Sequence, residues 1–118
     1  MGFWSDMWDG VKSFFKSIGR FLVKIWVAIV DFFGDVVNWF KNLFLVQDRD
    51  VPFIIANDKL KEMIHDAPVE DVGIFKGVLN EETGQITHHE VINAEDLDET
   101  TEKMLEKANE KDGILVLN

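Results

Sequence analysis

The 118-residue sequence contains no cysteine and no tyrosine, and it has only two prolines. The absence of cysteine excludes disulfide bonds, cysteine nucleophiles and thiolate metal ligands, and it fits a reducing compartment. The sequence also contains no glycine-rich phosphate loop, no GxSxG nucleophile elbow and no HExxH zinc motif. These absences argue against an enzyme, and we expect no catalytic residues, no cofactor and no metal.

Charge divides the chain at about residue 46. The net charge is −10 at pH 7, and because residues 1–46 are nearly balanced, almost all of the negative charge lies beyond them. An acidic body repels phosphate, so we expect no nucleic-acid partner. The four tryptophans all lie before this boundary. Tryptophan favours membrane interfaces and protein interfaces, which makes the N-terminal segment the candidate binding element.

The strongest pattern in the sequence is an apolar stripe over residues 4–43. Alternate steps of four and three residues from Trp4 reach an apolar side chain every time, which predicts a long amphipathic α-helix. A straight helix of this length would extend about 60 Å. Gly19 and Gly34 are the positions where it would kink or fold into a helical hairpin. The predicted membrane or assembly face consists of Trp4, Trp8, Val11, Phe15, Ile18, Leu22, Ile25, Trp26, Ile29, Phe32, Phe33, Val36, Trp39, Phe40 and Leu43.

The charged residues of this segment are also ordered. Like charges recur at four-residue spacing, where they repel each other on a helix, so a compensating partner is expected. Anionic lipid headgroups would suit the basic ladder, and so would the acidic step of an antiparallel neighbouring copy. The basic ladder is Lys12, Lys16, Arg20 and Lys24, and the acidic step is Asp31 and Asp35.

Residues 21–39 approach the length of a membrane-spanning helix, which needs about 20 mostly apolar residues. However, Lys24, Asp31 and Asp35 each cost about 2.5 to 3.5 kcal/mol near the bilayer centre. A single copy is therefore not expected to insert stably. A helix lying in the interface, or an assembly that hides the polar stripe, avoids this penalty. We expect the rest of the chain to offer too little apolar surface to cover the stripe intramolecularly.

Residues 47–52 form the predicted linker, because polar residues interrupt the stripe and Pro52 prevents a continuous helix. Residues 53–118 predict a small acidic α+β domain, so the fold class is α+β with a long N-terminal helix. Its predicted elements are a strand at 53–56, a short helix capped by Asn57 or Asp58, a hairpin of strands 72–79 and 85–92 with Gly84 at positive φ, a helix capped by Asp96, and a buried strand at 114–117.

The sequence His88-His89-Glu90 is the one cluster that suggests metal or acid–base chemistry. Adjacent strand residues point to opposite faces, so only His88 and Glu90 could converge, and no further His or Cys completes a site. His65 likewise has no neighbour at ligand spacing. We interpret these histidines as ordinary solvated residues, with a modest pH response near about pH 6 as the second hypothesis.

The leading functional hypothesis is a membrane-associated, self-assembling protein. Its N-terminal helix would form a pore, permeabilise a bilayer or act as a membrane scaffold, and its acidic domain, on the cytoplasmic side, would regulate it or bind a partner protein. The expected partners are other copies of the chain, a lipid bilayer and a protein. The alternative is a structural or adaptor subunit whose helix packs into a larger assembly such as a virion or secretion apparatus.

Overall fold

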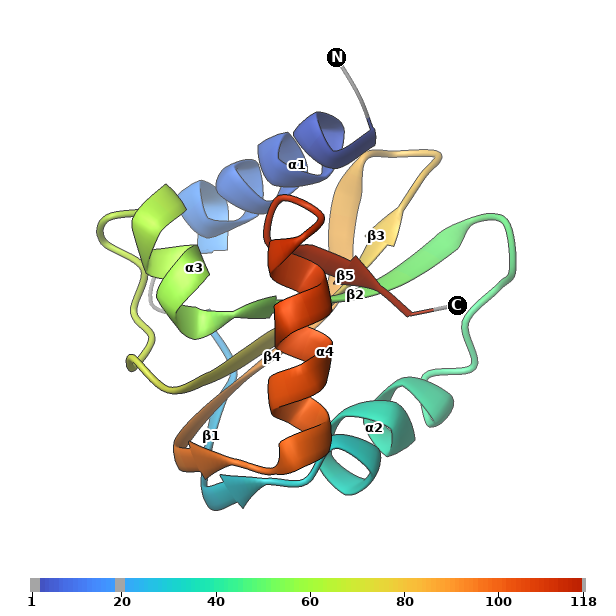
Figure 1. Cartoon of the computed structure of the whole chain (residues 1–118). Coiled ribbons are helices and arrows are strands. Elements are labelled where there is room, and N and C mark those ends of the chain that lie inside the picture. The colour runs from blue at the N-terminus through green and yellow to red at the C-terminus, as the bar shows by residue number, and fades with distance from the viewer. Residues whose placement is uncertain (1–2, 19–20, 118) are drawn as a thin grey trace.

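Five strands form one mixed sheet in the order β1-β4-β3-β2-β5 (Figure 1). The computed structural model describes residues 3–18 and 21–117, so the predictions on Gly19 and Arg20 lie outside the described residues. The strands are β1 (Lys24–Val30), β2 (Asp50–Ala56), β3 (Gly73–Asn80), β4 (Gln85–Leu97) and β5 (Ile114–Val116). The helices are α1 (Phe3–Ile18), the π-helical η2 (Phe32–Val37), α2 (Asn38–Lys41), α3 (Asn57–Met63) and α4 (Glu99–Asn109).

The strand pairing brings the two halves of the chain together. Strands β2, β3, β4 and β5 pair antiparallel, whereas β1 runs parallel to β4 at one edge of the sheet. Lys24 lies opposite Val91 in this parallel pair, so the contact spans much of the sequence. The N-terminal segment is therefore part of the same sheet as the acidic segment.

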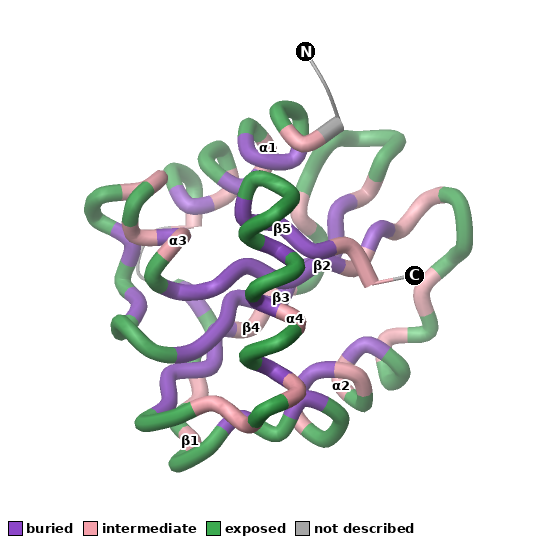
Figure 2. The backbone as a smooth tube through the Cα atoms, in the orientation of Figure 1, coloured by how far each residue is buried: buried purple, intermediate pink, exposed green. Residues whose placement is uncertain are grey.

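Both faces of the sheet are apolar and covered, because side chains alternate between faces along each strand. Phe53 and Ile55 of β2 point to the face under α1 and α3, whereas Ile54 points to the face under η2, α2 and α4. The central strands are accordingly buried along most of their length (Figure 2). The α1-side core consists of Met7, Trp8, Val11, Phe15, Leu22, Val51, Phe53, Ile55, Leu60, Ala67, Val69, Phe75, Leu79, Val91 and Ile114. The α4-side core consists of Val30, Phe32, Val36, Phe40, Ile54, Ala56, Ile74, Val78, Ile92, Ala94, Leu105, Ala108 and Leu115.

The α+β class is confirmed, and so are the strands and helices expected beyond residue 52. The hairpin turn forms as its sequence indicates, because Gly84 adopts φ 71° and the side-chain carbonyl of Asn80 accepts hydrogen bonds from the amides of Glu82 and Thr83. Asp50 and Pro52, which were expected in a linker, are already part of β2.

The prediction of one long N-terminal helix is wrong beyond Ile18, because residues 24–30 form β1. Val and Ile supply most of this stretch, and β-branched side chains favour strands because they lose rotamer freedom in a helix. After β1, a helical conformation begins at Phe32, and Gly34 lies inside η2 rather than at a bend between helices.

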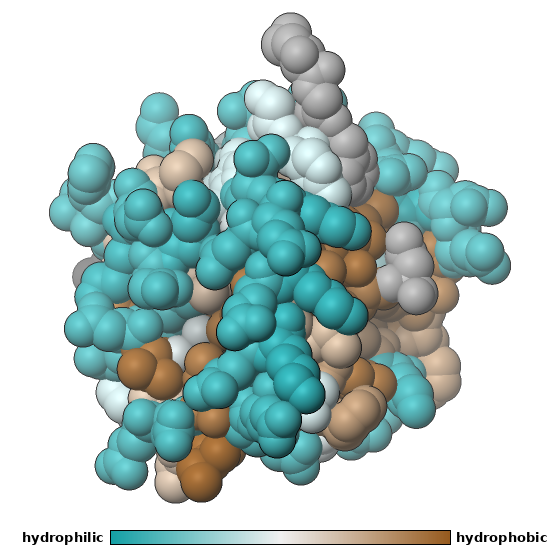
Figure 3. All heavy atoms as spheres, viewed as in Figure 1, coloured by the Kyte–Doolittle hydropathy of each residue, from teal (hydrophilic) through white to brown (hydrophobic). Residues whose placement is uncertain are grey.

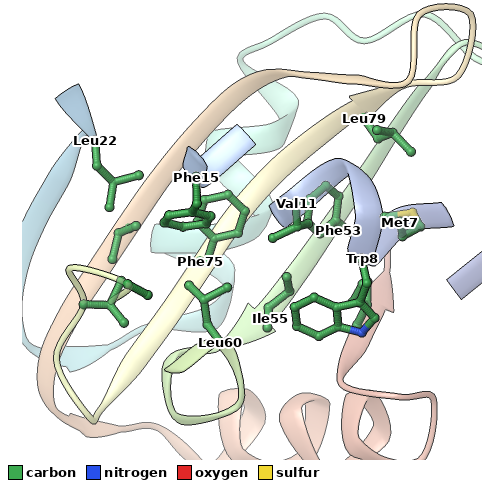
Figure 4. Close-up of a cluster of buried hydrophobic side chains, with 14 of the residues drawn as sticks. Met7, Trp8, Val11, Phe15, Leu22, Phe53, Ile55, Leu60, Phe75 and Leu79 are labelled. Atoms are coloured by element: carbon green, nitrogen blue, oxygen red, sulfur yellow. The ribbon is translucent and has the colours of Figure 1, made fainter. Parts of the chain in front are cut away.

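The expectation that the stripe could not be covered intramolecularly is also wrong for α1. Trp8, Val11 and Phe15 are buried against the sheet (Figure 4). The Trp8 Nε1 also donates a hydrogen bond of 2.8 Å to the carbonyl oxygen of Asp112. The strands supply more apolar surface than expected because β2 and β3 are apolar on both faces.

Two predicted helix caps differ in the structure. Asp98, not Asp96, caps α4 by accepting a 2.8 Å hydrogen bond from the amide of Thr101, because β4 continues as far as Leu97. Neither Asn57 nor Asp58 caps α3, which has Ala56 at the N-cap. The Asn57 amide is instead buried, where it donates to the carbonyl oxygen of Ile92 and to the side chain of Asn93.

Phe75 is the centre of the α1-side core, and its removal should cost the most stability. Its ring centroid lies 5.2 Å from that of Phe15 and 6.0 Å from that of Phe53. We expect Phe75→Ala to lower the free energy of unfolding by about 3 to 5 kcal/mol in urea titrations, because it opens a cavity. Phe44→Ala, at a side chain that is 88% exposed, is the control and should change it by less than about 0.5 kcal/mol. Equal midpoints for the two variants would contradict this assignment.

Candidate interaction surface

Exposed apolar side chains gather around β1 and the turn that follows it. Trp26 is 65% exposed, Ile29 57% and Phe33 63%, and Val23 is exposed as well. These four side chains, with the open backbone edge of β1, define what we call the β1 surface. Hydrophobic atoms are visible at the lower left of Figure 3, where Figure 1 places β1. Large exposed apolar side chains that cluster mark an interaction site, whereas scattered ones do not.

Alternation along β1 explains why Trp26 is exposed. Ile25 and Val27 point to the α4-side core and pack against it. Trp26 and Ala28 therefore point to the opposite face, and both are exposed there. The cover that α1 gives to the central strands does not extend over this edge.

The backbone of β1 is open on one side. The carbonyl oxygen of Val23 accepts a 2.9 Å hydrogen bond from the amide of Val91 in β4. Among the described strands, β4 is the only neighbour of β1, so its outer edge presents unpaired N–H and C=O groups. An open edge beside exposed apolar side chains is suited to accepting another strand.

A side chain of β4 and the N-cap side chain of α4 hold the residues that flank β1. The amide of Val23 donates a 2.9 Å hydrogen bond to Nε2 of His89, so this ring is neutral and carries its proton on Nδ1. Burial lowers the pKa of His89, and the nearby Glu90 carboxylate opposes that shift. At the other end, the amide of Phe32 donates to the Asp98 carboxylate at 3.1 Å.

A buried lysine joins η2 and α2 to the sheet. Lys76 of β3 is 1% exposed, and its Nζ donates to the Glu90 carboxylate and, at 2.7 Å, to the carbonyl oxygen of Asp35. The same ammonium lies 4.5 Å from the centre of the Trp39 ring, within cation–π range. Burial lowers the pKa of Lys76, whereas the hydrogen bond to Glu90 raises it. This arrangement positions the helical segment that follows β1.

A β-bulge in the β3–β4 hairpin brings Lys76 opposite Glu90. Leu79 lies opposite Ile86, but the register shifts between Val78 and Leu79, so that Lys76 faces Glu90. Without the shift, Lys76 would face His89. The irregularity therefore creates the buried ion pair and leaves His89 free to bond to β1.

The predicted apolar face is divided among several environments. Side chains on α1, η2 and α2 lie mostly in the two cores, and those of the β1 surface face solvent. Trp8, Val11, Phe15, Leu22, Phe32, Val36 and Phe40 are buried, Trp4, Ile18, Ile25, Trp39 and Leu43 are partly buried, and Trp26, Ile29 and Phe33 are exposed.

The charged residues that were predicted to contact lipid or a partner also lie in different parts of the structure. Lys24 and Asp31 are exposed at the two ends of β1, and Asp35 is half-buried above Lys76. Lys12 and Lys16 are exposed on α1, where they flank a groove of about 580 Å³ with an apolar floor that includes Phe15, Met63, Ile64, Ala67 and Pro68. Arg20 lies outside the described residues.

His88 and Glu90, the pair that could have converged, contact different neighbours. Glu90 bonds to Lys76, whereas His88 Nδ1 lies 3.1 Å from the Thr87 hydroxyl. Within residues 3–18 and 21–117, no three His, Cys, Asp or Glu side chains gather into a site for a metal ion. The helices of this part of the chain also lack the length and apolar character needed to cross a bilayer.

Sequence reasoning missed Lys76, the role of His89 and the edge position of β1. The usable signal for β1 was the run of Val and Ile in residues 23–30. The signal for Lys76 was a single charge in the apolar strand 72–79, where a buried charge requires a partner.

Comparison with known proteins gives one short match. A family model described as a TMP repeat matches residues 8–18, which lie within α1. No curated protein and no solved structure matches the chain. The match covers part of one helix and does not reach the β1 surface.

Removal of the buried lysine should destabilise the fold. Lys76→Ala leaves the Glu90 carboxylate without its counterion and the Asp35 carbonyl without a donor. We expect a loss of about 3 kcal/mol in the free energy of unfolding. The exposed Lys107→Ala, measured in the same urea titration, should change it by less than about 0.5 kcal/mol. A Lys76→Ala variant as stable as Lys107→Ala would show that the buried Lys76–Glu90 pair contributes nothing to the free energy of unfolding.

Stability should fall in mild acid because of His89. Since burial lowers the pKa of His89 in the folded state, the unfolded chain takes up the proton more readily, and the free energy of unfolding decreases as the pH falls below about 6.5. Protonation also removes the Nε2 acceptor from the Val23 amide.

Urea titrations at a series of pH values would measure this effect. His89→Phe keeps the ring contact with Phe14 but cannot titrate, so its stability should depend less on pH over this range. His65→Gln, at an exposed position, should retain the pH dependence of the unmodified protein. An unchanged profile in His89→Phe would exclude this role.

Proposed function

We propose that this chain is a self-assembling structural subunit whose copies join through the β1 surface. The observation that carries the proposal is the coincidence of an open strand edge with the exposed side chains of Trp26, Ile29 and Phe33. Strand addition uses both features, because backbone hydrogen bonds give affinity while side chains on alternate positions give specificity.

The composition of β1 supports a binding role. Proteins protect an open edge with charges, prolines, bulges or very short strands. β1 has seven residues and only one charge, Lys24, at its first position. An edge of this length and polarity would be an aggregation site unless a specific partner covered it, which favours a dedicated interface.

Association with a membrane surface is the second candidate. It is favoured by the exposed Trp26, two residues from the exposed Lys24, and by the exposed Phe33 beyond the other end of β1, because aromatic rings and lysines suit the headgroup region. Lipid tails cannot pair with the backbone edge of β1, whereas a strand can. The assembly proposal therefore accounts for more of the surface than the membrane proposal does.

A charge placed in the β1 surface should abolish assembly. We expect the unmodified protein to form a defined oligomer as its concentration rises from micromolar to millimolar in sedimentation velocity experiments, and Trp26→Glu to remain monomeric. The carboxylate would be buried without a partner at the contact. Circular dichroism should be unchanged, because Trp26 is largely exposed and lies outside both cores.

Phe44→Glu is the matched control, since it also replaces an exposed aromatic, in the segment between α2 and β2. That segment runs along the right of Figure 1, whereas β1 lies at the lower left. Phe44→Glu should assemble as the unmodified protein does, and a Trp26→Glu variant that still assembled would refute the proposal. Flotation with anionic liposomes separates the two candidates: unmodified protein that stays monomeric but floats, with Trp26→Glu failing to float, supports the membrane instead.

A further inference from the structure

We infer that the groove between α1 and the end of α3 binds a single-chain fatty acid, with its carboxylate at Lys12 and Lys16 and its acyl chain along the groove floor. The groove has a volume of about 580 Å³. α1 and α3 cover the same face of the sheet, at the upper left of Figure 1. The described residues that line the groove come from α1, from the end of α3 and from the loop after it, so this inference is independent of the β1 surface.

The floor of the groove is apolar. On one side Phe15 packs against Phe75, with the ring centroids 5.2 Å apart. On the other side Met63 and Ile64 end α3, and both are partly buried. Met63 is flexible and can adapt to the shape of a ligand, and Pro68 has no N–H to satisfy. An acyl chain requires apolar contacts and no hydrogen bonds, so it suits this floor.

The charges that line the groove are Lys12 and Lys16 on α1 and Asp66 on the opposite wall. The lysines are exposed, and because they are four residues apart they lie on one side of the helix and repel each other. Of the ion pairs in the described part of the chain, none includes either lysine. A carboxylate between them would accept hydrogen bonds from both ammonium groups and remove the repulsion. Since Asp66 repels an anion, the head group should lie against α1.

The size of the groove favours a lipid chain over a peptide. An α-helix is about 10 Å across and rises about 5.4 Å per turn, so one turn fills roughly 400 Å³. The groove would hold little more than one turn, whereas a docked helix uses anchors spread over two turns. An extended peptide needs backbone partners, and the polar groups of the α1 wall already bond within the helix. A volume of this size is typical of small-molecule sites.

Isothermal titration calorimetry of the full chain with dispersed octanoate, decanoate and dodecanoate would test the site. Each added methylene that the floor buries should lower Kd about fourfold. Decanol has the tail of decanoate without its charge, and it should bind about tenfold more weakly because it makes no charge-assisted hydrogen bond. Equal affinities for the three acids would mean that the floor does not hold the tail, and would overturn the inference.

A double lysine variant tests the head-group site. Lys12→Gln with Lys16→Gln removes both charges and preserves helix propensity. It should weaken decanoate binding about tenfold and change decanol binding by less than about twofold. The matched control is Lys103→Gln with Lys107→Gln, which makes the same change at the same spacing on α4, over the other face of the sheet. This control should bind decanoate as the unmodified protein does, and an equal loss in both double variants would refute the assigned site.

A floor variant and amide NMR spectra locate the tail. Met63→Gln places an amide on the floor at similar volume, so it should weaken decanoate and decanol alike. In the unmodified protein, decanoate should shift the amide signals of Phe15, Met63 and Ile64. Shifts confined to other parts of the chain would place the ligand elsewhere and overturn the inference.

The remaining outcomes separate this inference from the proposed function. If dispersed decanoate does not bind but anionic vesicles do, the ligand is a membrane surface and the fatty-acid site is wrong. If decanoate binds as described while the unmodified protein remains monomeric at every concentration, the fatty-acid site stands and self-assembly fails. If the protein assembles through Trp26 but binds none of the acids, self-assembly stands and the fatty-acid site is overturned.

Discussion

The need to cover both faces of one small sheet governs the whole structure. β3 is buried from Gly73 to Leu79, so neither of its faces can meet water. The N-terminal segment supplies cover on both sides, because α1 packs on one face while η2 and α2 pack on the other. To pass from one face to the other, the chain must go around an edge of the sheet. β1 is that passage, and it pairs with β4 on the way, which explains why apolar residues surround this part of the sequence.

The bulge in the β3–β4 hairpin links this passage to the buried charge. By shifting the register, it brings Glu90 opposite Lys76 and sends His89 toward the start of β1. Lys76 then reaches Asp35 and Trp39 on the segment after β1. Consecutive residues of β4 thus hold both the beginning of β1 and the helices that follow it. A buried ion pair contributes little net stability by itself, but removing one partner is costly, so this arrangement favours one position of η2 and α2.

The sequence was sufficient to predict the strands and helices of the acidic segment, but it was insufficient to predict those of residues 21–46. Beyond residue 52 the elements are short, are separated by clear turn signals such as Gly84, and form mainly with neighbours in the chain. In residues 21–30 nearly every position is apolar, so a helical repeat and a strand alternation fit equally well, and only β-branched content favoured the strand. Pairing with β4 determines that this stretch is a strand, because Lys24 lies opposite Val91. A local sequence pattern cannot predict a contact between residues so far apart in the chain. Lys76 and Glu90 could not be paired in advance because the bulge moves the register expected from the turn.

The two edges of the sheet differ in a way that bears on the size of an assembly. β5 spans only Ile114–Val116, and an edge strand this short offers little for pairing. β1 is longer, and its seven residues include no acid, whereas the outer face of α4 carries Glu102, Glu106 and Glu110. Two molecules that each carry a charge of −10 repel, so contact is least costly where acids are fewest. A two-fold contact at β1 would use both long edges at once and leave only β5 at each end. Sheet growth through β1 would then stop at two copies, because the other edge among the described strands is β5, which is too short to extend a filament.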